Sequence, residues 1–216
     1  MKAIIFDMDG VILNSEPLHI KVCEEILHDL KISIPENFFD KYLGVANPVM
    51  WKEIKEELKI EKSVEELVQL QESKTFVTIR KISITESPNL IKFLEVLKKE
   101  NIPCIIASSS PQELINIIVE KLKLESYFKY WISAENYNTS KPDPTIFLEA
   151  SKKLEISPKH CVVIEDSENG IKAAKKANMK CIAYTKFHIG NPNIKEADVA
   201  INNFSELLNL EFFNNL

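Results

Sequence analysis

A stretch near the start of the chain, Phe6 to Glu16 with the sequence FDMDGVILNSE, constrains the fold more than any other. It continues the apolar run Ala3 to Phe6, which predicts a short buried strand. Asp7 and Asp9 stand at the end of this strand. Because an isolated buried carboxylate is very costly, two acids at this place require a cation, a metal or dense hydrogen bonding. Mg²⁺ binds through one or two carboxylates plus substrate phosphates, so the first hypothesis is a magnesium-assisted phosphate site.

The next part of the chain, from Pro17 to about Lys81, has apolar residues at helical spacing. A loop around Gly44 interrupts it, and Asn47 is expected to cap a helix opened by Pro48. Since no strand pattern occurs there, we expect an all-helical insertion. The predicted helices cover 17–31, 48–60 and 63–80.

From Ser87 onward, strand and helix patterns alternate. The predicted strands cover 103–107, 130–133, 161–164, 180–184 and 198–201, and the predicted helices cover 87–100, 110–122, 143–154 and 167–177. The helix over 110–122 is expected to begin with a capping box, Ser110-Pro111-Gln112-Glu113. Strands that alternate with helices predict a parallel sheet covered on both faces, and right-handed crossovers make it a doubly wound α/β fold.

Polar side chains follow four of the predicted strands. In chain order they are Asp7 and Asp9, then Ser108 and Ser109, then Lys141, then Glu165 and Asp166. In a doubly wound sheet, ligands bind at the carboxyl ends of the strands. The sequence therefore predicts that acids, hydroxyls and a lysine meet at one edge of the sheet.

Composition limits the partners. The net charge of −5 argues against nucleic acid, and Arg80 is the only arginine, so lysine must bind phosphate as a point charge. The four cysteines have no CxxC spacing, which favours buried thiols in a reducing compartment. The sequence has neither an apolar leader region nor a stretch of membrane-spanning length, so a cytoplasmic location without membrane contact is expected.

Four motifs, DMDGVI, Ser108-Ser109, SKPDP around Lys141 and Glu165-Asp166, occur in the order of a known family. They resemble the haloacid dehalogenase-like hydrolases, in particular the small phosphatases and β-phosphoglucomutase-like enzymes. The resemblance implies a Rossmann-like core formed by residues 1–14 and 82–216 and a helical cap formed by 15–81. It also implies that the cap is a mobile lid, with hinges near 13–15 and 82–85.

The resemblance assigns roles to the residues at the strand ends. Asp7 is expected to be the nucleophile that forms an aspartyl phosphate, and Asp9 the general acid and base. Phosphate is expected to bind Ser108, Ser109 and Lys141. The implied Mg²⁺ ligands are Asp7, Glu165, Asp166 and, through its backbone carbonyl, Asp9.

A purely structural interpretation exists for some of these residues. The serines from 108 to 110 are also typical of a polar helix cap, and we assign that role to Ser110 but not to Ser108. Asp166 next to Ser167 is also typical of a helix start. That interpretation does not explain why two adjacent acids end an apolar strand.

Three residues of the insertion, Glu16, His19 and Asn47, are candidates for substrate contacts in the cap. His19 is equally consistent with a helix-surface histidine. The resembled mutases carry an arginine where Asn47 stands, to hold the second phosphate of a bisphosphate. Asn47 lacks that charge, and Lys52 and Lys74 are the possible substitutes. This departure argues against a mutase more than against a phosphatase.

The leading hypothesis is a Mg²⁺-dependent hydrolase of a small phosphomonoester such as a sugar phosphate, acting as a monomer. The alternative is a β-phosphoglucomutase-like mutase that uses the same aspartyl phosphate. A dehalogenase is disfavoured, because it needs neither Asp9 nor the acidic pair. A non-catalytic binding protein on this fold is the third hypothesis. Loss of an acid or of Lys141 would be its signature, and none is lost.

Overall fold

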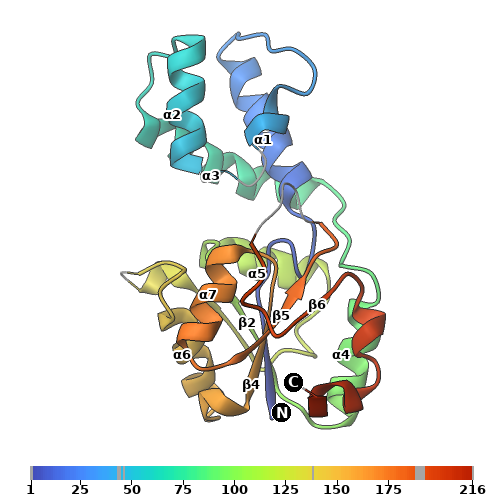
Figure 1. Cartoon of the computed structure of the whole chain (residues 1–216). Coiled ribbons are helices and arrows are strands. Elements are labelled where there is room, and N and C mark those ends of the chain that lie inside the picture. The colour runs from blue at the N-terminus through green and yellow to red at the C-terminus, as the bar shows by residue number, and fades with distance from the viewer. Residues whose placement is uncertain (1, 43–44, 46, 138, 188–192, 216) are drawn as a thin grey trace. The chain divides into compact units, whose positions relative to one another are not determined.

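The computed structural model describes residues 2–42, 45, 47–137, 139–187 and 193–215. The chain forms two compact units. The core unit is Met1–Asn14 with Ile84–Leu216, and the helical unit is Ser15–Ser83 (Figure 1). The helical unit is thus inserted in the core unit directly after the acidic stretch that ends the first strand.

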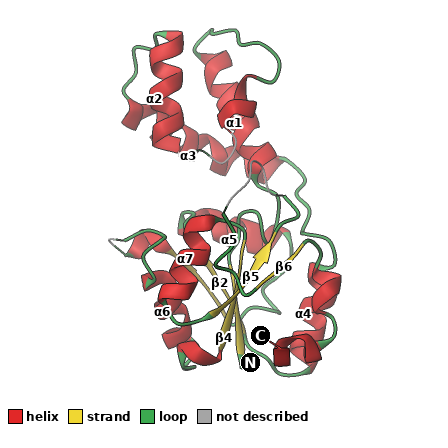
Figure 2. Ribbon diagram, viewed as in Figure 1, coloured by secondary structure: helices red, strands yellow, loops and turns green. Residues whose placement is uncertain are grey.

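The core unit contains one parallel sheet. Its strands are β1 (Ala3–Phe6), β2 (Cys104–Ser108), β3 (Tyr130–Ser133), β4 (Cys161–Glu165), β5 (Lys180–Tyr184) and β6 (Val199–Ile201). Their order across the sheet is β3-β2-β1-β4-β5-β6, and helices lie on both sides of it (Figure 2). The predicted doubly wound α/β fold is therefore confirmed.

Alternation along β1 divides the core into two layers. Ala3 and Ile5 point to the layer covered by α6 (Thr145–Lys153) and α7 (Glu168–Lys176). Phe6 points to the other layer, where its ring centroid lies 6.2 Å from that of Phe93 on α4 (Leu90–Lys99). Right-handed crossovers place α5 (Gln112–Lys121) in the same layer as α4. Each fully buried Ile or Phe contributes about 1.5–3 kcal/mol to stability.

The sheet reverses its strand order between β1 and β4. These strands pair in parallel with Phe6 opposite Ile164, and the Asp7 backbone N–H donates to the Ile164 carbonyl at 2.9 Å. The following segments therefore leave the same edge of the sheet side by side. In doubly wound sheets this reversal creates the crevice in which ligands bind.

The helical unit consists of α1 (Glu16–Asp29), α2 (Asn47–Leu58) and α3 (Val64–Lys81). Trp51 of α2 and Leu67 of α3 are completely buried, as the helical spacing of apolar residues requires. A capping box begins α3: the Ser63 hydroxyl accepts from the Glu66 backbone N–H at 3.1 Å, and the Glu66 carboxylate accepts from the Ser63 N–H at 2.7 Å.

Three predicted helix starts are corrected. The helix predicted from Ser87 begins at Leu90, because Asn89 adopts a left-handed φ of 62°. The helix predicted from Ser110 begins at Gln112, after an N-cap Pro111 that no side chain caps. Asn47, expected to precede α2, is its first residue. Gly44, expected in the neighbouring loop, lies outside the described residues.

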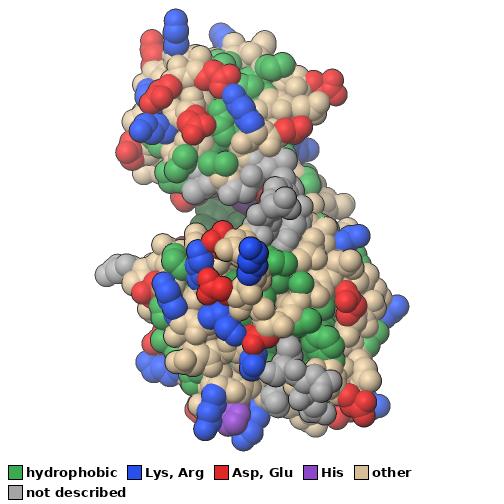
Figure 3. All heavy atoms as spheres, in the orientation of Figure 1, with side chains coloured by type: hydrophobic (Ala, Val, Ile, Leu, Met, Phe, Trp, Pro, Cys, Tyr) green, Lys and Arg blue, Asp and Glu red, His purple; other side chains and the backbone are tan. Residues whose placement is uncertain are grey.

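All four cysteines are buried and unpaired, as predicted. None of the helices in the described part of the chain has the length and apolar character needed to cross a membrane. On the face seen in Figure 3, basic and acidic side chains are interspersed over both units.

Candidate active site

The ends of β1 and β4 bring together the three carboxyl groups predicted from the acidic motifs. Oxygens of Asp7, Glu165 and Asp166 all lie within 4.8 Å of one another. Asp7 is 5% exposed and Glu165 is 1% exposed. They meet because β1 and β4 are neighbours in the sheet, although the chain between them passes through β2 and β3.

Lys141 reaches into this cluster from the loop after β3. Its Nζ donates to Asp7 Oδ1 and, at 2.5 Å, to Glu165 Oε1. The ammonium also lies 5.1 Å from the centroid of the Phe147 ring. Its side chain is only 8% exposed, so it is a buried counter-ion rather than a surface lysine.

Glu165 is held at both of its oxygens. One binds Lys141, and the other accepts from the Ser167 backbone N–H at 2.6 Å and from the Ser167 hydroxyl at 3.0 Å. The same hydroxyl accepts from the Gly170 N–H at 3.0 Å and so caps α7. The helix-start interpretation therefore describes Ser167 correctly, while Glu165 connects that cap to the acidic cluster.

Two glycines leave room for the acids. A Cβ on Gly10 would lie 2.0 Å from Asp166 Oδ2, and one on Gly170 would lie 1.7 Å from Glu165 Oε1. Gly10 also has a φ of +74°, which other residues rarely adopt. Neither glycine was predicted as part of the site. The position of Gly10 directly after Asp9 could have indicated its role. No feature of the sequence indicated a role for Gly170.

The cluster carries excess negative charge. Three carboxylates and one ammonium sum to −3 + 1 = −2 when all are ionised. Burial raises the pKa of Asp7 to about 8, opposed by Lys141 and reinforced by Glu165 and Asp9. Burial and the charges of Glu165 and Asp7 raise the pKa of Asp166 to about 9. Burial alone would lower the pKa of the Lys141 ammonium. The negative charges of Asp7 and Glu165 outweigh this effect and raise the pKa.

This donor set fits a divalent cation. A charge of +2 balances the cluster, and carboxylate oxygens are the ligands that Mg²⁺ prefers. Burial is the main cause of the raised pKa of both Asp7 and Asp166, and the negative charge of Glu165 adds to it, so a bound cation would favour the ionised form of both acids. The side chain of Asp9 is not part of the cluster among the described residues.

Asp9 instead lies against the loop after β2. Its Oδ2 accepts from the Ser110 hydroxyl at 2.7 Å and, more distantly, from the Ser108 hydroxyl at 3.4 Å. Its Oδ1 is shielded from solvent and has no hydrogen-bond partner in the described structure. The capping prediction for Ser110 is therefore wrong. Its hydroxyl donates to the Asp9 carboxylate, and Pro111 is the N-cap residue of α5.

The serines of this loop are organised around a buried hydroxyl. Ser108 is completely buried, and its Oγ accepts from the Ser110 backbone N–H at 3.0 Å. Ser133, at the end of β3, donates to the Ser110 carbonyl at 2.7 Å. Ser109 is exposed. The loop after β2 is thus fixed by β1 on one side and by β3 on the other.

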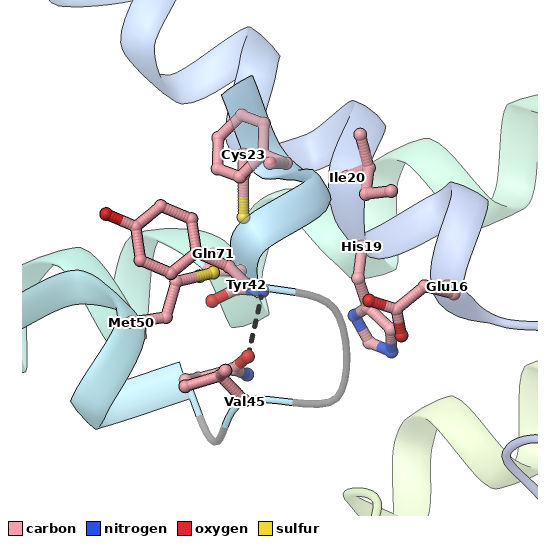
Figure 4. A pocket seen from close by; sticks show the side chains of 10 residues that line it. Glu16, His19, Ile20, Cys23, Tyr42, Val45, Met50 and Gln71 are labelled. Atoms are coloured by element: carbon pink, nitrogen blue, oxygen red, sulfur yellow. Dashed lines mark hydrogen bonds between the residues drawn. The ribbon is translucent and has the colours of Figure 1, made fainter. Parts of the chain in front are cut away.

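The insertion candidates lie in the helical unit and line one pocket there. Glu16 and His19 come from α1 (Figure 4), and Asn47 comes from α2. The proposed arginine substitutes are elsewhere: Lys52 is exposed, and Lys74 forms an ion pair with Asp29 at 2.7 Å. Neither lysine is among the described residues that line the pocket.

Comparison with known proteins identifies the family of this chain. The family model described as haloacid dehalogenase-like hydrolase matches residues 4–184, which include all the strand-end groups named above. The chain belongs to the haloacid dehalogenase-like hydrolase family. It is thus a member of an enzyme family, and the predicted resemblance is confirmed.

Named relatives cover nearly the whole chain. It is 30% identical to a phosphorylated carbohydrates phosphatase of Thermotoga maritima, covering 97% of this chain and 98% of that protein. It is 29% identical to a β-phosphoglucomutase of Bacillus subtilis, covering 96% and 92%. A solved haloacid dehalogenase-like hydrolase of family IA from Entamoeba histolytica matches with a TM-score of 0.81 at 28% identity, covering 100% and 99%. A phosphatase and a mutase thus have nearly the same sequence identity to this chain.

Proposed function

We propose that this protein hydrolyses a small phosphomonoester, such as a sugar phosphate, through an aspartyl phosphate on Asp7 and with Mg²⁺. The observation that carries the proposal is the group formed by buried Asp7 and Glu165, half-buried Asp166 and the Lys141 ammonium at the reversal of the strand order. Phosphoryl transfer requires a nucleophile and positive charge around the transferred group, and this cluster supplies both when a cation is bound. Relatives named as a carbohydrate phosphatase and a phosphoglucomutase support the substrate class.

In the first step, an oxygen of Asp7 attacks phosphorus and the bond from phosphorus to the ester oxygen breaks. Asp9 gives the leaving oxygen its proton. Lys141 is placed to offset charge on Asp7 and on the phosphoryl group. The hydroxyl of Ser108 and the N–H of Ser109 hold phosphoryl oxygens, since Ser108 ends the neighbouring strand β2 and Ser109 follows it at the same edge of the sheet.

In the second step, Asp9 removes a proton from water, the water oxygen attacks phosphorus, and the bond from phosphorus to Asp7 breaks. Phosphate leaves, and the carboxylate of Asp7 is restored. When bound, Mg²⁺ stabilises the charge on the transferred group. Asp7, Glu165 and Asp166, with the Asp9 carbonyl, would hold it.

A second candidate, a phosphosugar mutase, uses the same groups and differs in what accepts the phosphoryl group. The similarity to a named β-phosphoglucomutase favours it. The residue at position 47 argues against it, since Asn47 has no charge for a second phosphate and neither Lys52 nor Lys74 lines the pocket with it. We therefore give precedence to the phosphatase.

Phosphorus NMR of the purified protein with Mg²⁺ separates the two. The sample contains a pool of sugar phosphates, including β-glucose 1-phosphate with a trace of the 1,6-bisphosphate. Growth of free phosphate, with loss of one ester, is the expected result. Conversion of the 1-phosphate to the 6-phosphate with little free phosphate would establish the mutase. No change in any ester would contradict both.

A further inference from the structure

The two carboxylate oxygens of Asp9 have different surroundings within the core unit. Oδ2 accepts from the Ser110 hydroxyl at 2.7 Å and, more distantly, from the Ser108 hydroxyl at 3.4 Å. Oδ1 is shielded from solvent and has no hydrogen-bond partner in the described structure. A shielded carboxylate oxygen without a partner is costly, so a difference of this kind between the two oxygens requires a reason.

Of the two serines, Ser110 is the one that can keep Oδ2 in place during the reaction. A serine hydroxyl has only one proton to donate. In the proposed reaction the Ser108 hydroxyl donates that proton to a phosphoryl oxygen and gives up its long contact with Asp9. The Ser110 hydroxyl then remains as the donor to Oδ2 while substrate is bound.

The backbone of Ser110 is fixed on both sides. Its N–H donates to Ser108 Oγ at 3.0 Å, and its carbonyl accepts from the Ser133 hydroxyl at 2.7 Å. Ser133 is completely buried at the end of β3, where it pairs in register with Ser108 at the end of β2. The sheet therefore fixes Ser133, and Ser133 fixes the loop that carries Ser110.

A purely structural role does not account for the Ser133 hydroxyl. Its Oγ accepts from the Glu135 N–H at 3.1 Å and so caps the short 3₁₀ turn at Ala134–Asn136. That cap uses only a lone pair of the hydroxyl. The proton is directed instead to the carbonyl of Ser110, 23 positions earlier in the chain.

We infer that Ser110 and Ser133 are positioning residues for Asp9, and that Oδ1 is the oxygen of Asp9 that exchanges the proton. The inference rests on the proposed phosphatase function. In the first step the Oδ1–H bond breaks, and its proton goes to the ester oxygen as the bond from that oxygen to phosphorus breaks. In the second step Oδ1 takes a proton from the attacking water. Oδ2 keeps its hydrogen bond with Ser110 in both steps.

Two esters with different leaving groups separate the steps that need Asp9. A sugar leaves as a strongly basic alkoxide and needs a proton, whereas 2,4-dinitrophenolate is a weak base and leaves without one. Rapid-quench measurement of the released leaving group gives the rate of the first step. The steady-state rate also includes the second step, in which Asp9 acts as the base for either ester.

Ser110→Ala should slow the first step about tenfold for the best sugar monophosphate of the pool. For 2,4-dinitrophenyl phosphate the first step should stay within about twofold of the wild-type rate, since no proton is needed. The steady-state rate should fall for both esters, so a burst of dinitrophenolate should precede slow turnover. In Asp9→Asn protein, Ser110→Ala should have no further effect on the first step, because Ser110 acts through Asp9.

Ser133→Ala should give the same pattern with a smaller loss, about threefold in the first step with the sugar monophosphate. The double variant with Ser110→Ala should lose no more than Ser110→Ala alone, because both changes act on the same carboxylate. The matched control is Ser151→Ala. Ser151 is buried on α6, and its hydroxyl donates to the Leu148 carbonyl of the same helix at 2.8 Å. This control removes a similar bond and should leave both steps unchanged for both esters.

The outcomes separate this inference from the proposed function. If the wild-type protein forms no phosphoenzyme from either ester, the proposed function is wrong and this inference falls with it. If phosphoenzyme forms but Ser110→Ala slows the first step equally for both esters, the phosphatase chemistry stands. The two serines then shape the phosphate site rather than position Asp9, and the inference is overturned. Additive losses in the double variant would overturn it as well.

Discussion

The acidic cluster of the core unit and the pocket of the helical unit differ in the kind of polar group that they bury. The cluster has four ionisable side chains within hydrogen-bonding or ligand distance, three of them acidic. The pocket has a chain of neutral groups, Trp51, Gln71 and Asn47. Charged groups in a buried site depend on one another, because removing one leaves the others uncompensated. Neutral groups can be exchanged at much lower cost.

We expect this difference to separate chemistry from selectivity. A substitution in the cluster should impair all phosphoesters alike, because every ester presents the same phosphoryl group to Asp7. A substitution in the pocket should change the ratio between esters, because only the rest of the molecule differs. The predictions below test this separation in order of decreasing effect.

Asp7→Asn should have the largest effect. Without a carboxylate nucleophile no phosphoenzyme forms, and kcat should fall by about 10⁴-fold or more for sugar phosphates and phenyl phosphate alike. Acid-quenched mass spectrometry should detect the phosphorylated peptide in wild-type protein only, while circular dichroism should show an intact fold. Normal turnover by this variant would refute the nucleophile assignment.

Lys141→Met should lower the free energy of unfolding as well as the rate of the reaction. It leaves Asp7 and Glu165 buried without their counter-ion, and breaking a buried pair in this way costs about 3–5 kcal/mol. Urea unfolding should measure this loss. The control is Lys172→Met, which breaks the half-exposed pair with Glu168 and should cost under about 1 kcal/mol. Similar losses in the two variants would mean that the buried cluster is not charged.

Metal and pH should act together on stability. The pKa values of Asp7 and Asp166 lie above the ordinary carboxyl value, so the metal-free folded state binds more protons than the unfolded state. Stability without metal should therefore fall as the pH rises from about 4 to about 9. Mg²⁺ at 100 times its Kd should add about 2.7 kcal/mol. Calorimetry with Mg²⁺ and with EDTA should show a Tm difference that widens toward pH 9, and a constant difference would argue against these ligands.

Ser110→Ala should have a smaller effect, on kcat rather than on KM. The hydroxyl holds Asp9 Oδ2 at 2.7 Å, and losing the orientation of an acid and base should lower kcat about tenfold for all esters. Ser110→Thr keeps a hydroxyl and should restore most of the rate. Ser73→Ala, on exposed α3 surface, is the control. A loss confined to one ester would assign Ser110 to substrate binding.

Asn47→Arg should have the smallest effect and should act on selectivity. It supplies the charge that a second phosphate would need, and a partly exposed ion pair contributes up to about 1 kcal/mol. Inhibition by glucose 1,6-bisphosphate should strengthen by about fivefold, while hydrolysis of phenyl phosphate should change less. A uniform loss for all esters would break the separation between cluster and pocket.

Most of the fold was predictable because its signals are local. Apolar runs bounded by turn residues gave β3 and β5 with their observed bounds, and the change from helical spacing to alternating strands after residue 81 marked the insertion. The helix starts at Leu90 and Gln112 were not predicted correctly. In both places the hydroxyl of a serine before the helix donates a hydrogen bond to a residue far away in the sequence: Ser87 to the Val11 carbonyl, and Ser110 to Asp9. Sequence spacing does not reveal such bonds.

The candidate site was predictable where strand ends carry unusual residues. Asp7, Glu165 and Asp166 follow apolar strands, and their convergence required only the rule for parallel sheets. The roles of Ser133, Gly170 and Gln71 were not predictable, because each depends on which side chain of another element lies opposite. In the sequence they are an ordinary strand end, a helix glycine and a helix glutamine.

Because β1 and β4 are neighbours, the site is completed late during synthesis. Asp7 and Lys141, which contact each other directly, are 134 positions apart in the chain. At the usual rate of synthesis, about 5–20 residues per second, this separation corresponds to about 7–27 s between the emergence of the two side chains. Throughout that time the acidic end of β1 has neither Lys141 nor its neighbouring strand β4, although β2 is made earlier. A ribosome-bound fragment that stops before β4 should therefore be without the metal site, and catalytic competence should appear only when nearly the whole chain has been made.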